Sequence, residues 1–427
     1  MVELNPQQKT VLGLQHMVAM FGATILVPLI VGWNPSIALF SAGIGTLMFH
    51  FVSKGVVPVF LGSSFAFIGP ILLAQAEGYN FASIGLGIVG AGVVYLIVSA
   101  LVRFVPDGSR HIRNLFPPVV TGPVIAVIGI FLAPVAINQA KDLWWLAIVA
   151  LLATIIAAIY FKGLFKMLPI LTGFVVAYVV AIIFGEVNWD SFTEASWLAW
   201  PDFGGILDGG DLDWGALWVI APVALVTMIE HVGDILTNGR VVGKDFFEEP
   251  GVNRTLLGDG LATIFAGFVG GPPNTTYSEN TGVLAVTKVY DPSVLRIGAM
   301  FAIVLGFIPK FGALLQTVPV PVLGGLSIVL FGMIASVGMR VLVESQVNLS
   351  HSRNLIIVGL ILVIGLGFGA FDQVTGLLGT EWESFLPQIG DVKLSGLALA
   401  AVVGVAANLI LPKEEETTEV ETDEMAS

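Results

Sequence analysis

The stretch GGPPNTTYSENTGV, residues 270–283, cannot form an ordinary membrane helix, although apolar segments flank it on both sides. It opens with two glycines and two prolines, and proline breaks helical hydrogen bonding. Polar residues and the ionisable Glu279 follow. The flanking segments IFAGFVGG and VLAV leave little room for a turn outside a membrane. Non-helical backbone at membrane depth occurs only where it is buried in protein or lines a cavity, so the stretch predicts a binding site near the membrane midplane.

The composition indicates that the rest of the chain crosses a membrane many times. Of the 427 residues, 56% are hydrophobic and only 11% are charged, whereas soluble globular proteins carry about 25% charged residues. Apolar runs of about 18–25 residues recur, and each is long enough to cross a bilayer core of about 30 Å. We therefore predict an all-α polytopic membrane protein. Cysteine is absent, which excludes disulfides and thiol chemistry.

Fourteen transmembrane segments are predicted, several of them short or broken. They lie near residues 11–32, 36–53, 57–75, 83–105, 117–138, 143–161, 165–185, 214–238, 254–271, 274–287, 292–309, 315–339, 354–371 and 393–412. If the N-terminus is cytoplasmic, 15 of the 18 Lys and Arg residues fall on the cytoplasmic side, and the exceptions are Lys141, Lys310 and Lys393. Basic residues concentrate on that side of membrane proteins, so both termini are predicted to be cytoplasmic in a multi-pass protein of the cell membrane. The first apolar segment is expected to be a span and not a cleaved signal peptide.

Two acidic segments lie outside the predicted spans. The longest connection, residues 187–213, is predicted to be an extracellular or periplasmic solvated loop with interfacial tryptophans. Residues 413–427 contain seven acidic residues and account for much of the net charge of −13. Such a composition predicts a disordered cytoplasmic tail. Nucleic-acid binding has no support in this charge balance.

The long loop divides the spans into seven and seven, which predicts an inverted repeat because an odd number of spans reverses the second half. Related pieces fall at equivalent positions of the two halves. LQHMVAMFGATILVP (14–28) corresponds to TMIEHVGDILT (227–237), and LGSSFAFIGP (61–70) corresponds to PPNTTYSENTGV (272–283).

Carboxyl groups at membrane depth are the strongest candidates for function. Glu230 and Asp234 are four residues apart and so share one helix face. An acid in a membrane span is by default a functional hypothesis, and desolvation favours its neutral form, so it can exchange protons. Together with Glu279 in the broken segment, Glu230 could hold a neutral, planar solute that forms hydrogen bonds. For Asp234 a helix end facing cytoplasmic water is the alternative, and for His231 packing is favoured over a proton relay.

Other residues carry weaker signals. In LGSSFAFIGP, Phe65 or Phe67 could stack on a flat ring. Asp259 opens the ninth span, where capping or a cytoplasmic surface role is favoured over coupling. Metalloprotease, serine hydrolase and Walker A motifs are absent from the sequence. We therefore predict no enzyme, no cofactor and no metal.

At these motifs the chain resembles the nucleobase–ascorbate (nucleobase–cation symporter-2) transporter family, and within it most closely the bacterial uracil permeases. The resemblance is carried by LQHMVAMFGATILVP, LGSSFAFIGP, MIEHVGDIL, NTTYSENTGVLAVTKVY and PVPVLGGLSIVLFG. It implies fourteen spans in a seven-plus-seven inverted repeat, with short extended strands in broken spans 3 and 10. A core domain would comprise residues 10–105 and 214–309, and a gate domain residues 112–186 and 310–412. Members usually form homodimers through the gate domain.

The resemblance also implies roles for particular residues. Glu230 and Glu279 would hold a pyrimidine, Phe65 would lie beside its ring, and Ser278 would offer backbone hydrogen bonds. We further assign substrate binding to Ser64 and Tyr277, proton coupling to His16, Glu230, Asp234 and Glu279, and structural roles to Asn280 and Gly233.

Two positions depart from the family pattern. Ser278 stands where uracil permeases often have glycine, and Asp234 stands where some have histidine. TTYSEN differs from the signature of purine-type members and favours pyrimidines.

The sequence therefore predicts a proton-coupled symporter that imports uracil or a closely related pyrimidine, with protons and membrane lipid as its other partners. A xanthine or purine symporter of the same family is the alternative. An anion transporter of related fold and an intramembrane enzyme using Glu230 and Glu279 are less favoured. Neither broken segment contains Lys or Arg to hold an anion.

The predicted topology can be tested with single cysteines, since the chain has none of its own. A reporter fused after Lys413 should be active only in its cytoplasmic form. Asp208→Cys should react with an impermeant thiol reagent in intact cells, and Lys288→Cys should react only after permeabilisation. Labelling of Asp208→Cys only from inside would reject this orientation.

Overall fold

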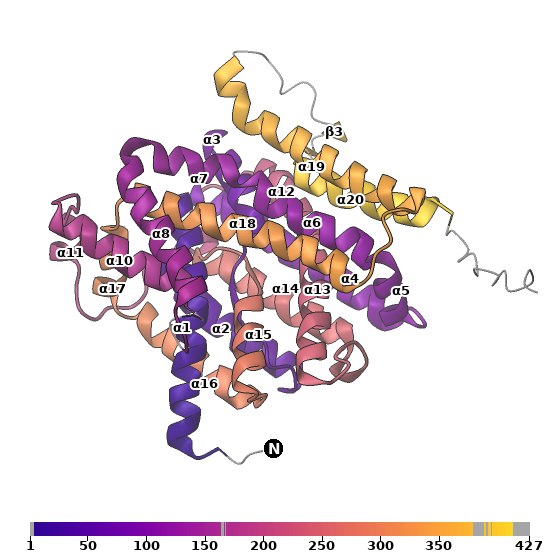
Figure 1. Ribbon diagram of the computed structural model, residues 1–427, viewed down its shortest axis with the longest axis horizontal. Coiled ribbons are helices and arrows are strands. Elements are labelled where there is room, and N and C mark those ends of the chain that lie inside the picture. Colours follow the sequence, from indigo (N-terminus) through magenta and orange to yellow (C-terminus); the bar gives the residue numbers. More distant parts are fainter. Residues whose placement is uncertain are drawn as a thin grey trace, which may run out of the picture.

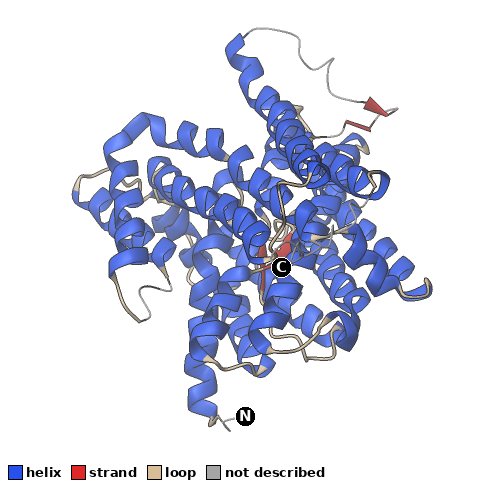
Figure 2. Cartoon of the chain, turned by 45° about the vertical axis from the view of Figure 1, so that its right-hand side comes forward, coloured by secondary structure: helices blue, strands red, loops and turns tan. Residues whose placement is uncertain are grey.

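The structure is a computed structural model that describes residues 4–163, 166, 168–378, 388–389, 392–393 and 395–412. The described chain is built almost wholly from helices (Figure 1, Figure 2). The predicted acidic tail, residues 413–427, lies outside the described residues.

The first half of the chain contains one short strand among its helices. Its elements are α1 (Pro6–Val31), α2 (Pro35–Val52), β1 (Leu61–Ser63), η1 (Phe65–Phe67), α3 (Ile68–Ala76), α4 (Phe81–Phe104), α5 (Gly108–Leu115), α6 (Pro118–Phe131), α7 (Ala133–Ala140), η2 (Lys141–Leu143), α8 (Trp144–Tyr160) and α10 (Pro169–Ile183).

The second half repeats this mixture of long and broken helices. Its elements are α11 (Asp190–Glu194), η3 (Gly205–Asp208), α12 (Gly215–Ile220), η4 (Ala221–Val223), α13 (Ala224–Val242), the π-helix η5 (Phe247–Gly251), α14 (Val252–Val269), β2 (Asn274–Thr276), α15 (Ser278–Thr287), α16 (Pro292–Gly306), α17 (Pro309–Gln316), α18 (Val320–Glu344), α19 (Ser352–Leu378), β3 (Gln388–Ile389), β4 (Val392–Lys393) and α20 (Gly396–Ile410).

The prediction of a polytopic helical membrane protein is confirmed. Within the described residues, six helical segments are long and apolar enough to cross a membrane, or seven if α16 and α17, bent by 82°, form one span. Shorter apolar helices add to these, among them α10 and α20. Outward-facing side chains such as Leu101, Ile183 and Val363 are more than half exposed, as lipid-facing residues are when no bilayer is present. The fourteen-span inverted repeat stays a prediction.

Local sequence explains where several helices begin and end. Asn5 starts α1 with a capping box, because its side chain accepts from Gln8 N–H while Gln8 reaches back to the Asn5 backbone. Gly32 ends α1 in the left-handed conformation with φ of 76°, which glycine adopts without steric cost. Asn80 caps α4 in the same way as Asn5 begins α1, by accepting from Ser83 N–H.

The strands β1 and β2 form an antiparallel pair inside the helical body, shown in red near the centre of Figure 2. Leu61 pairs with Thr276, and Ser63 pairs with Asn274, and all six strand residues are buried. Two further backbone bonds extend the pairing, from Ser64 N to Pro273 O at 2.8 Å and from Tyr277 N to Phe60 O at 3.0 Å. We call this pair, with its flanking residues, the strand crossing.

Helices α2 and α14 supply the partners that the outer edges of the strand crossing need. The Leu61 N–H donates to Thr46 Oγ1 of α2 at 2.9 Å. The Asn274 carbonyl accepts from Thr263 Oγ1 of α14 at 3.0 Å. A two-stranded pair of three residues has little stability of its own, so these surrounding helices hold it in place.

Residues 187–213, predicted to be a solvated loop, are partly structured and partly packed on the helical body. They contain α11 and η3. Gly205 is buried and lies so close to α14 that an added Cβ would be 2.4 Å from the Gly267 carbonyl oxygen. The Phe203 ring packs on Phe40 of α2 with centroids 5.3 Å apart. Acidic character alone therefore overstated how much of this segment faces water.

Gly62 of β1 tests how tightly the strand crossing is packed. A Cβ at this position would lie 2.5 Å from Tyr277 Cζ and 2.6 Å from Thr24 Oγ1. Overpacking of this kind costs about 1–3 kcal/mol, so Gly62→Ala should lower the thermal unfolding midpoint in detergent. Gly282→Ala on α15 is the matched control, because no atom lies within 4 Å of its added Cβ. Equal midpoints for both variants would show that the crossing has room to relax.

Candidate functional site

Helix α13 passes beside the strand crossing and is bonded to it through Asp234. The Asp234 carboxylate accepts from Thr276 Oγ1 at 2.8 Å and from Ser278 Oγ at 2.6 Å. α13 continues to Val242, two turns beyond Asp234. The alternative of a solvated helix end is therefore wrong, and Asp234 instead ties α13 to β2 and to the first turn of α15.

Two further carboxyl groups lie close to this link and form no hydrogen bond to another residue in the described part of the chain. Glu230 is one turn earlier on α13, half-buried, and its Oε2 is buried with no hydrogen-bond partner in the described part of the chain. Glu279 is the second residue of α15 and is exposed. The exposed face of α15 continues from Glu279 through Gly282 to Val286, so this carboxyl group opens on to solvent. A buried polar atom without a partner costs free energy, which a bound ligand can recover.

Backbone donors are also available at the crossing. Each strand is followed by a helix, η1 and α3 after β1, and α15 after β2. Neither η1 nor α15 has a side-chain cap at its start. The first N–H groups of a helix have no partner within it, so these two starts present donors at the level of the strands.

Ser64 and Phe65 lie on the β1 side of the crossing. The hydroxyl of Ser64 is buried without a hydrogen-bond partner among the described residues. Phe65 is 7% exposed, and its ring meets Phe331 of α18 edge-on, with centroids 6.0 Å apart and planes at 75°. Sequence analysis did not single out Phe331, which lies at the end of the quoted motif PVPVLGGLSIVLFG and has no polar signal.

Tyr277, Asn280 and His16 make contacts that hold the backbone together. The Tyr277 hydroxyl donates to the Ser63 carbonyl at 2.8 Å across the crossing. Asn280 Nδ2 donates to the His16 carbonyl at 2.9 Å and lies 3.1 Å from His16 Nδ1, which joins α15 to α1. Their placement suits structural roles, and the binding and coupling roles assigned to Tyr277 and His16 stay predictions.

Gly233 has room beside its Cα, whereas Asp259 is enclosed by neighbouring helices. A Cβ at Gly233 would meet only Ile125 Cδ1 of α6, at an ordinary 3.6 Å. Asp259 is completely buried in α14 and lies 2.9 Å from His231, so the predicted cytoplasmic surface role is wrong. The sequence pattern placed Asp259 at the start of a span. In the structure α14 begins seven residues earlier, so Asp259 lies inside the helix.

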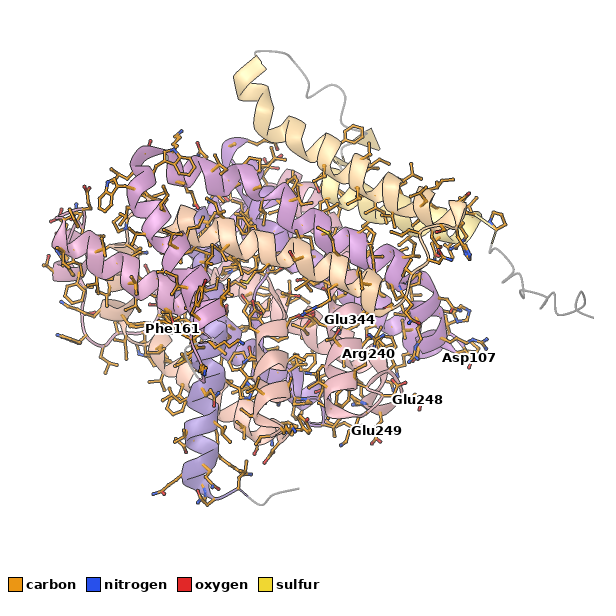
Figure 3. All side chains as sticks on the ribbon, in the orientation of Figure 1. Asp107, Phe161, Arg240, Glu248, Glu249 and Glu344 are labelled. Atoms are coloured by element: carbon orange, nitrogen blue, oxygen red, sulfur yellow. The ribbon has the colours of Figure 1, made fainter. Side chains whose placement is uncertain are left out.

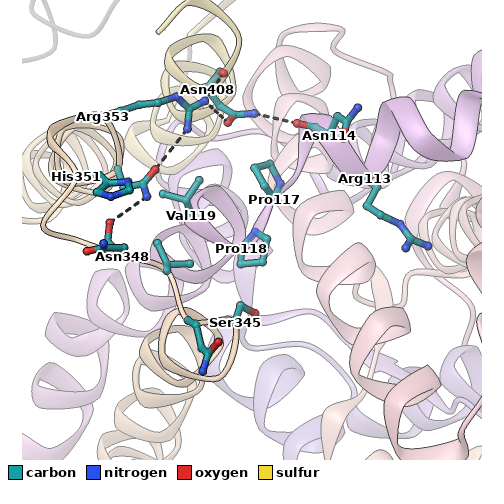
Figure 4. Close-up of a pocket in the computed structure, with 13 residues that line it drawn as sticks. Arg113, Asn114, Pro117, Pro118, Val119, Ser345, Asn348, His351, Arg353 and Asn408 are labelled. Carbon is teal, nitrogen blue, oxygen red and sulfur yellow. Dashed lines mark hydrogen bonds between the residues drawn. The ribbon is translucent and has the colours of Figure 1, made fainter. Parts of the chain in front are cut away.

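A cavity with different chemistry lies between α5, α18, α19 and α20. It has a volume of about 420 Å³ and is lined by Arg113, Asn114, Ser345, His351, Arg353 and Asn408, among others. In it Arg353 donates to Asn408 Oδ1 at 2.8 Å, and Asn408 donates to the Asn114 carbonyl at 2.9 Å (Figure 4). No carboxylate lines this cavity. The charged residues Arg240, Glu248 and Glu249 lie near one another on the ribbon (Figure 3).

Solute transporters with discontinuous helices typically have this arrangement, in which uncapped helix starts and carboxyl groups surround a strand pair inside a helical membrane protein. Comparison with known sequences gives the particular family. The profile of the Permease family matches residues 7–373, and the chain belongs to this family. It is a permease and not an enzyme.

Individual relatives agree with this assignment. The chain is 44% identical to the uracil permease of Bacillus subtilis, over 94% of this chain and 92% of that protein. It is 43% identical to the uracil permease of Bacillus caldolyticus, over 96% of this chain and 93% of that protein. The uracil permease of Escherichia coli K12 is 39% identical over 96% and 92%. The family resemblance stated from the motifs is confirmed.

Solved structures share the fold at low sequence identity. The transmembrane domain of the cyanobacterial bicarbonate transporter BicA has a TM-score of 0.59 and 16% identity, and covers 87% of this chain and 98% of that chain. The murine solute carrier 26 family member A9 anion transporter in the inward-facing state has a TM-score of 0.63 and 11% identity, covering 96% and 68%. At this identity the likeness shows the fold alone.

The hydroxyl groups that hold Asp234 can be tested by a matched pair of isosteric substitutions. Thr276→Val removes a donor to the carboxylate, and hydrogen bonds to charged groups are worth about 1.5–3 kcal/mol, so the unfolding midpoint should fall. Thr275→Val is the control, because its buried Oγ1 has no hydrogen-bond partner in the described structure. That variant should unfold at or above the parent midpoint. An equal fall in both would remove the case for a special Asp234 contact.

Proposed function

We propose that the protein is a proton-coupled symporter that imports uracil or a closely related pyrimidine. The observation that carries the proposal is a pair of carboxyl groups next to the strand crossing. Glu230 of α13 has a buried Oε2 without a hydrogen-bond partner among the described residues, and Glu279 is exposed in the first turn of α15, directly after β2. Relatives at 39–44% identity over more than nine-tenths of this chain bear the name uracil permease, which supports the choice of substrate.

The groups at the crossing match the hydrogen-bonding edge of a pyrimidine dione. Uracil offers ring N–H donors and carbonyl acceptors in one plane. Glu230 and Glu279 would accept from the N–H groups, and the uncapped N–H groups at the start of α15, beginning with Ser278, would donate to the carbonyls. Phe65 would lie against the ring, and Ser64 would supply a further hydroxyl.

Asp234 would link protonation to the substrate-binding segment. A hydroxyl group both donates and accepts, so Thr276 and Ser278 can bond to Asp234 whether it is ionised or protonated, by reversing the direction of the bond. Ser278 directly precedes Glu279. A proton that leaves Glu230 toward the cytoplasm would reach Asp234 through a water, and the altered bond would act on the residue next to Glu279.

The transport cycle would be alternating access between a core domain (10–105 and 214–309) and a gate domain (112–186 and 310–412), in a fourteen-span inverted repeat. The edge-on contact of Phe65 with Phe331 joins these two units beside the proposed site. We further propose a homodimer through the gate domain, in the cell membrane, with both termini in the cytoplasm.

An anion substrate and a purine are less well supported. Anion transporters of similar fold need a cation or equivalent field in the site, and neither broken segment, 61–70 or 270–283, contains Lys or Arg. A xanthine-type purine is the remaining candidate within the family. Competition experiments decide between the two bases.

Labelled uracil uptake into proteoliposomes under an imposed proton gradient tests the substrate. Excess unlabelled uracil should abolish the signal, and xanthine or uric acid should leave most of it. A collapsed gradient should reduce uptake to equilibration. Strong inhibition by xanthine with none by unlabelled uracil would reject a pyrimidine permease.

Substitution of Glu230 or Glu279 should abolish uracil binding, whereas substitution of Asp234 should abolish only accumulation against a gradient. Losing a buried hydrogen bond to the ring costs about 1–3 kcal/mol, or roughly 5- to 150-fold in affinity. Glu230→Ala and Glu279→Ala should therefore lose detectable equilibrium binding in detergent. Asp234→Asn should bind uracil within about tenfold of the parent yet fail to accumulate it against a gradient, since it makes no ring contact.

The matched control is Glu248→Ala, the same substitution at an exposed acid of η5 that has no part in the proposed site. It should bind and accumulate uracil like the parent. Full accumulation by Asp234→Asn would show that this residue only holds the strand crossing in place.

A further inference from the structure

A second buried polar cluster borders α13 and has no part in the proposed binding or coupling. His231 Nδ1 lies 2.9 Å from Asp259 Oδ2, which is an ion-pair distance although the N–H direction does not meet hydrogen-bond geometry, and both side chains are 0% exposed. The ring of Tyr95 on α4 stands edge-on to His231, with centroids 6.4 Å apart and planes at 90°. Phe49 of α2 lies on the same imidazole, with centroids also 6.4 Å apart. The cluster thus joins α2, α4, α13 and α14.

The charges in this cluster have to balance within it. No lysine or arginine forms an ion pair with Asp259 in the described part of the chain. Two lone pairs facing each other at 2.9 Å would repel, so a proton sits on Nδ1 or on Oδ2. A second proton on Nε2 makes the pair neutral overall, as imidazolium with carboxylate or as imidazole with carboxylic acid. An uncompensated charge in such a site would cost several kcal/mol.

Glycine contacts bring the helices close enough for this pairing. A Cβ at Gly260, next to Asp259, would lie 2.6 Å from Tyr95 Cβ, and one at Gly92 would lie 2.6 Å from the Gly260 carbonyl oxygen. A Cβ at Gly258 would lie 2.9 Å from Phe49 Cδ2. Small residues on both sides of Asp259 therefore allow α14 to approach α4 and α2 closely. The packing leaves the His231–Asp259 pair little freedom to move.

His231 directly follows Glu230 on α13, about 100° around the helix axis. Fixing the direction of one side chain therefore fixes the direction of the other. We propose that His231 and Asp259 are positioning residues that set the rotation of α13 and so hold Glu230 toward the strand crossing, where it accepts from the nucleobase. This role rests on the proposed function of Glu230.

The pair has no direct contact with water. Both side chains are completely enclosed, whereas Glu230 and Asp234 are half-buried and Glu279 is exposed. A proton exchanged with water would therefore use those three groups. The titratable groups around the pair are Tyr95 on α4 and Glu230 and Asp234 on its own helix. Asp259 is thus separated in function from the coupling carboxylates.

A set of variants separates positioning from stability. Asp259→Leu and His231→Leu each leave one polar group buried without its partner, so both should unfold at lower temperature. The double variant leaves neither, so its unfolding midpoint should recover. Its affinity for uracil in detergent should nevertheless stay at least tenfold weaker, because no directional contact then orients Glu230. Asp259→Asn keeps a polar oxygen of the same size beside His231 Nδ1, and should bind uracil within about threefold of the parent.

The control is Thr255→Val, a buried polar residue one turn earlier on α14 that bonds only locally, to the Val252 carbonyl. It should bind uracil like the parent. Parent-like affinity in the folded double variant would overturn the positioning role. Loss of uracil binding by a folded Asp259→Asn variant would also overturn it, as would a shift in the pH profile of uracil uptake by that variant. Either result would show that the charge or the proton of the pair is essential. Failure of the parent protein itself to bind uracil would instead reject the proposed function.

Discussion

The requirement that backbone polar groups be satisfied inside the membrane is the constraint on which this structure depends. The segments around residues 61–63 and 274–276 are too rich in glycine and proline to complete helices, and at this depth no water compensates for the lost bonds. The two segments satisfy each other's backbone groups by antiparallel pairing. At the outer edges, Thr46 of α2 accepts from the Leu61 N–H and Thr263 of α14 donates to the Asn274 carbonyl. Breaking the two helices therefore forces a contact between halves of the chain that are more than 200 residues apart.

The same constraint creates the site. A strand pair inside a helical body gives two new helix starts, one after β1 at Ser64 and Phe65 and one after β2 at Ser278 and Glu279. Helix α13 completes the site because Asp234 bonds to Thr276 and Ser278, one residue on each side of Tyr277. The groups proposed for binding and for coupling are thus joined through a single short segment, as the proposed link between proton movement and solute movement requires.

Fold and chemistry are separable in this architecture. Transporters of bicarbonate and other anions share the fold at 11–16% identity. The scaffold supplies uncapped helix starts, which by themselves favour negative or hydrogen-bond-accepting groups. In this chain carboxyl groups lie next to the crossing, and in the proposed function they accept from ring N–H groups of the solute. The residues placed at the crossing therefore decide which class of solute the scaffold would carry.

The sequence by itself determined the class of protein, the two broken segments and the three carboxyl groups of the candidate site. These features are local: hydropathy over one span, helix breakers in a row, and two acids four residues apart on one helix face. Tertiary structure alone decided which strands pair, that Asp234 bonds to Thr276 and Ser278, and that Phe331 of α18 meets Phe65. It also showed that Asp259 is enclosed beside His231, where its place in the chain had suggested a surface. Each of these contacts joins residues that are distant in sequence, and their partners are set by how closely glycine-bearing helices such as α4 and α14 approach, which no local pattern encodes.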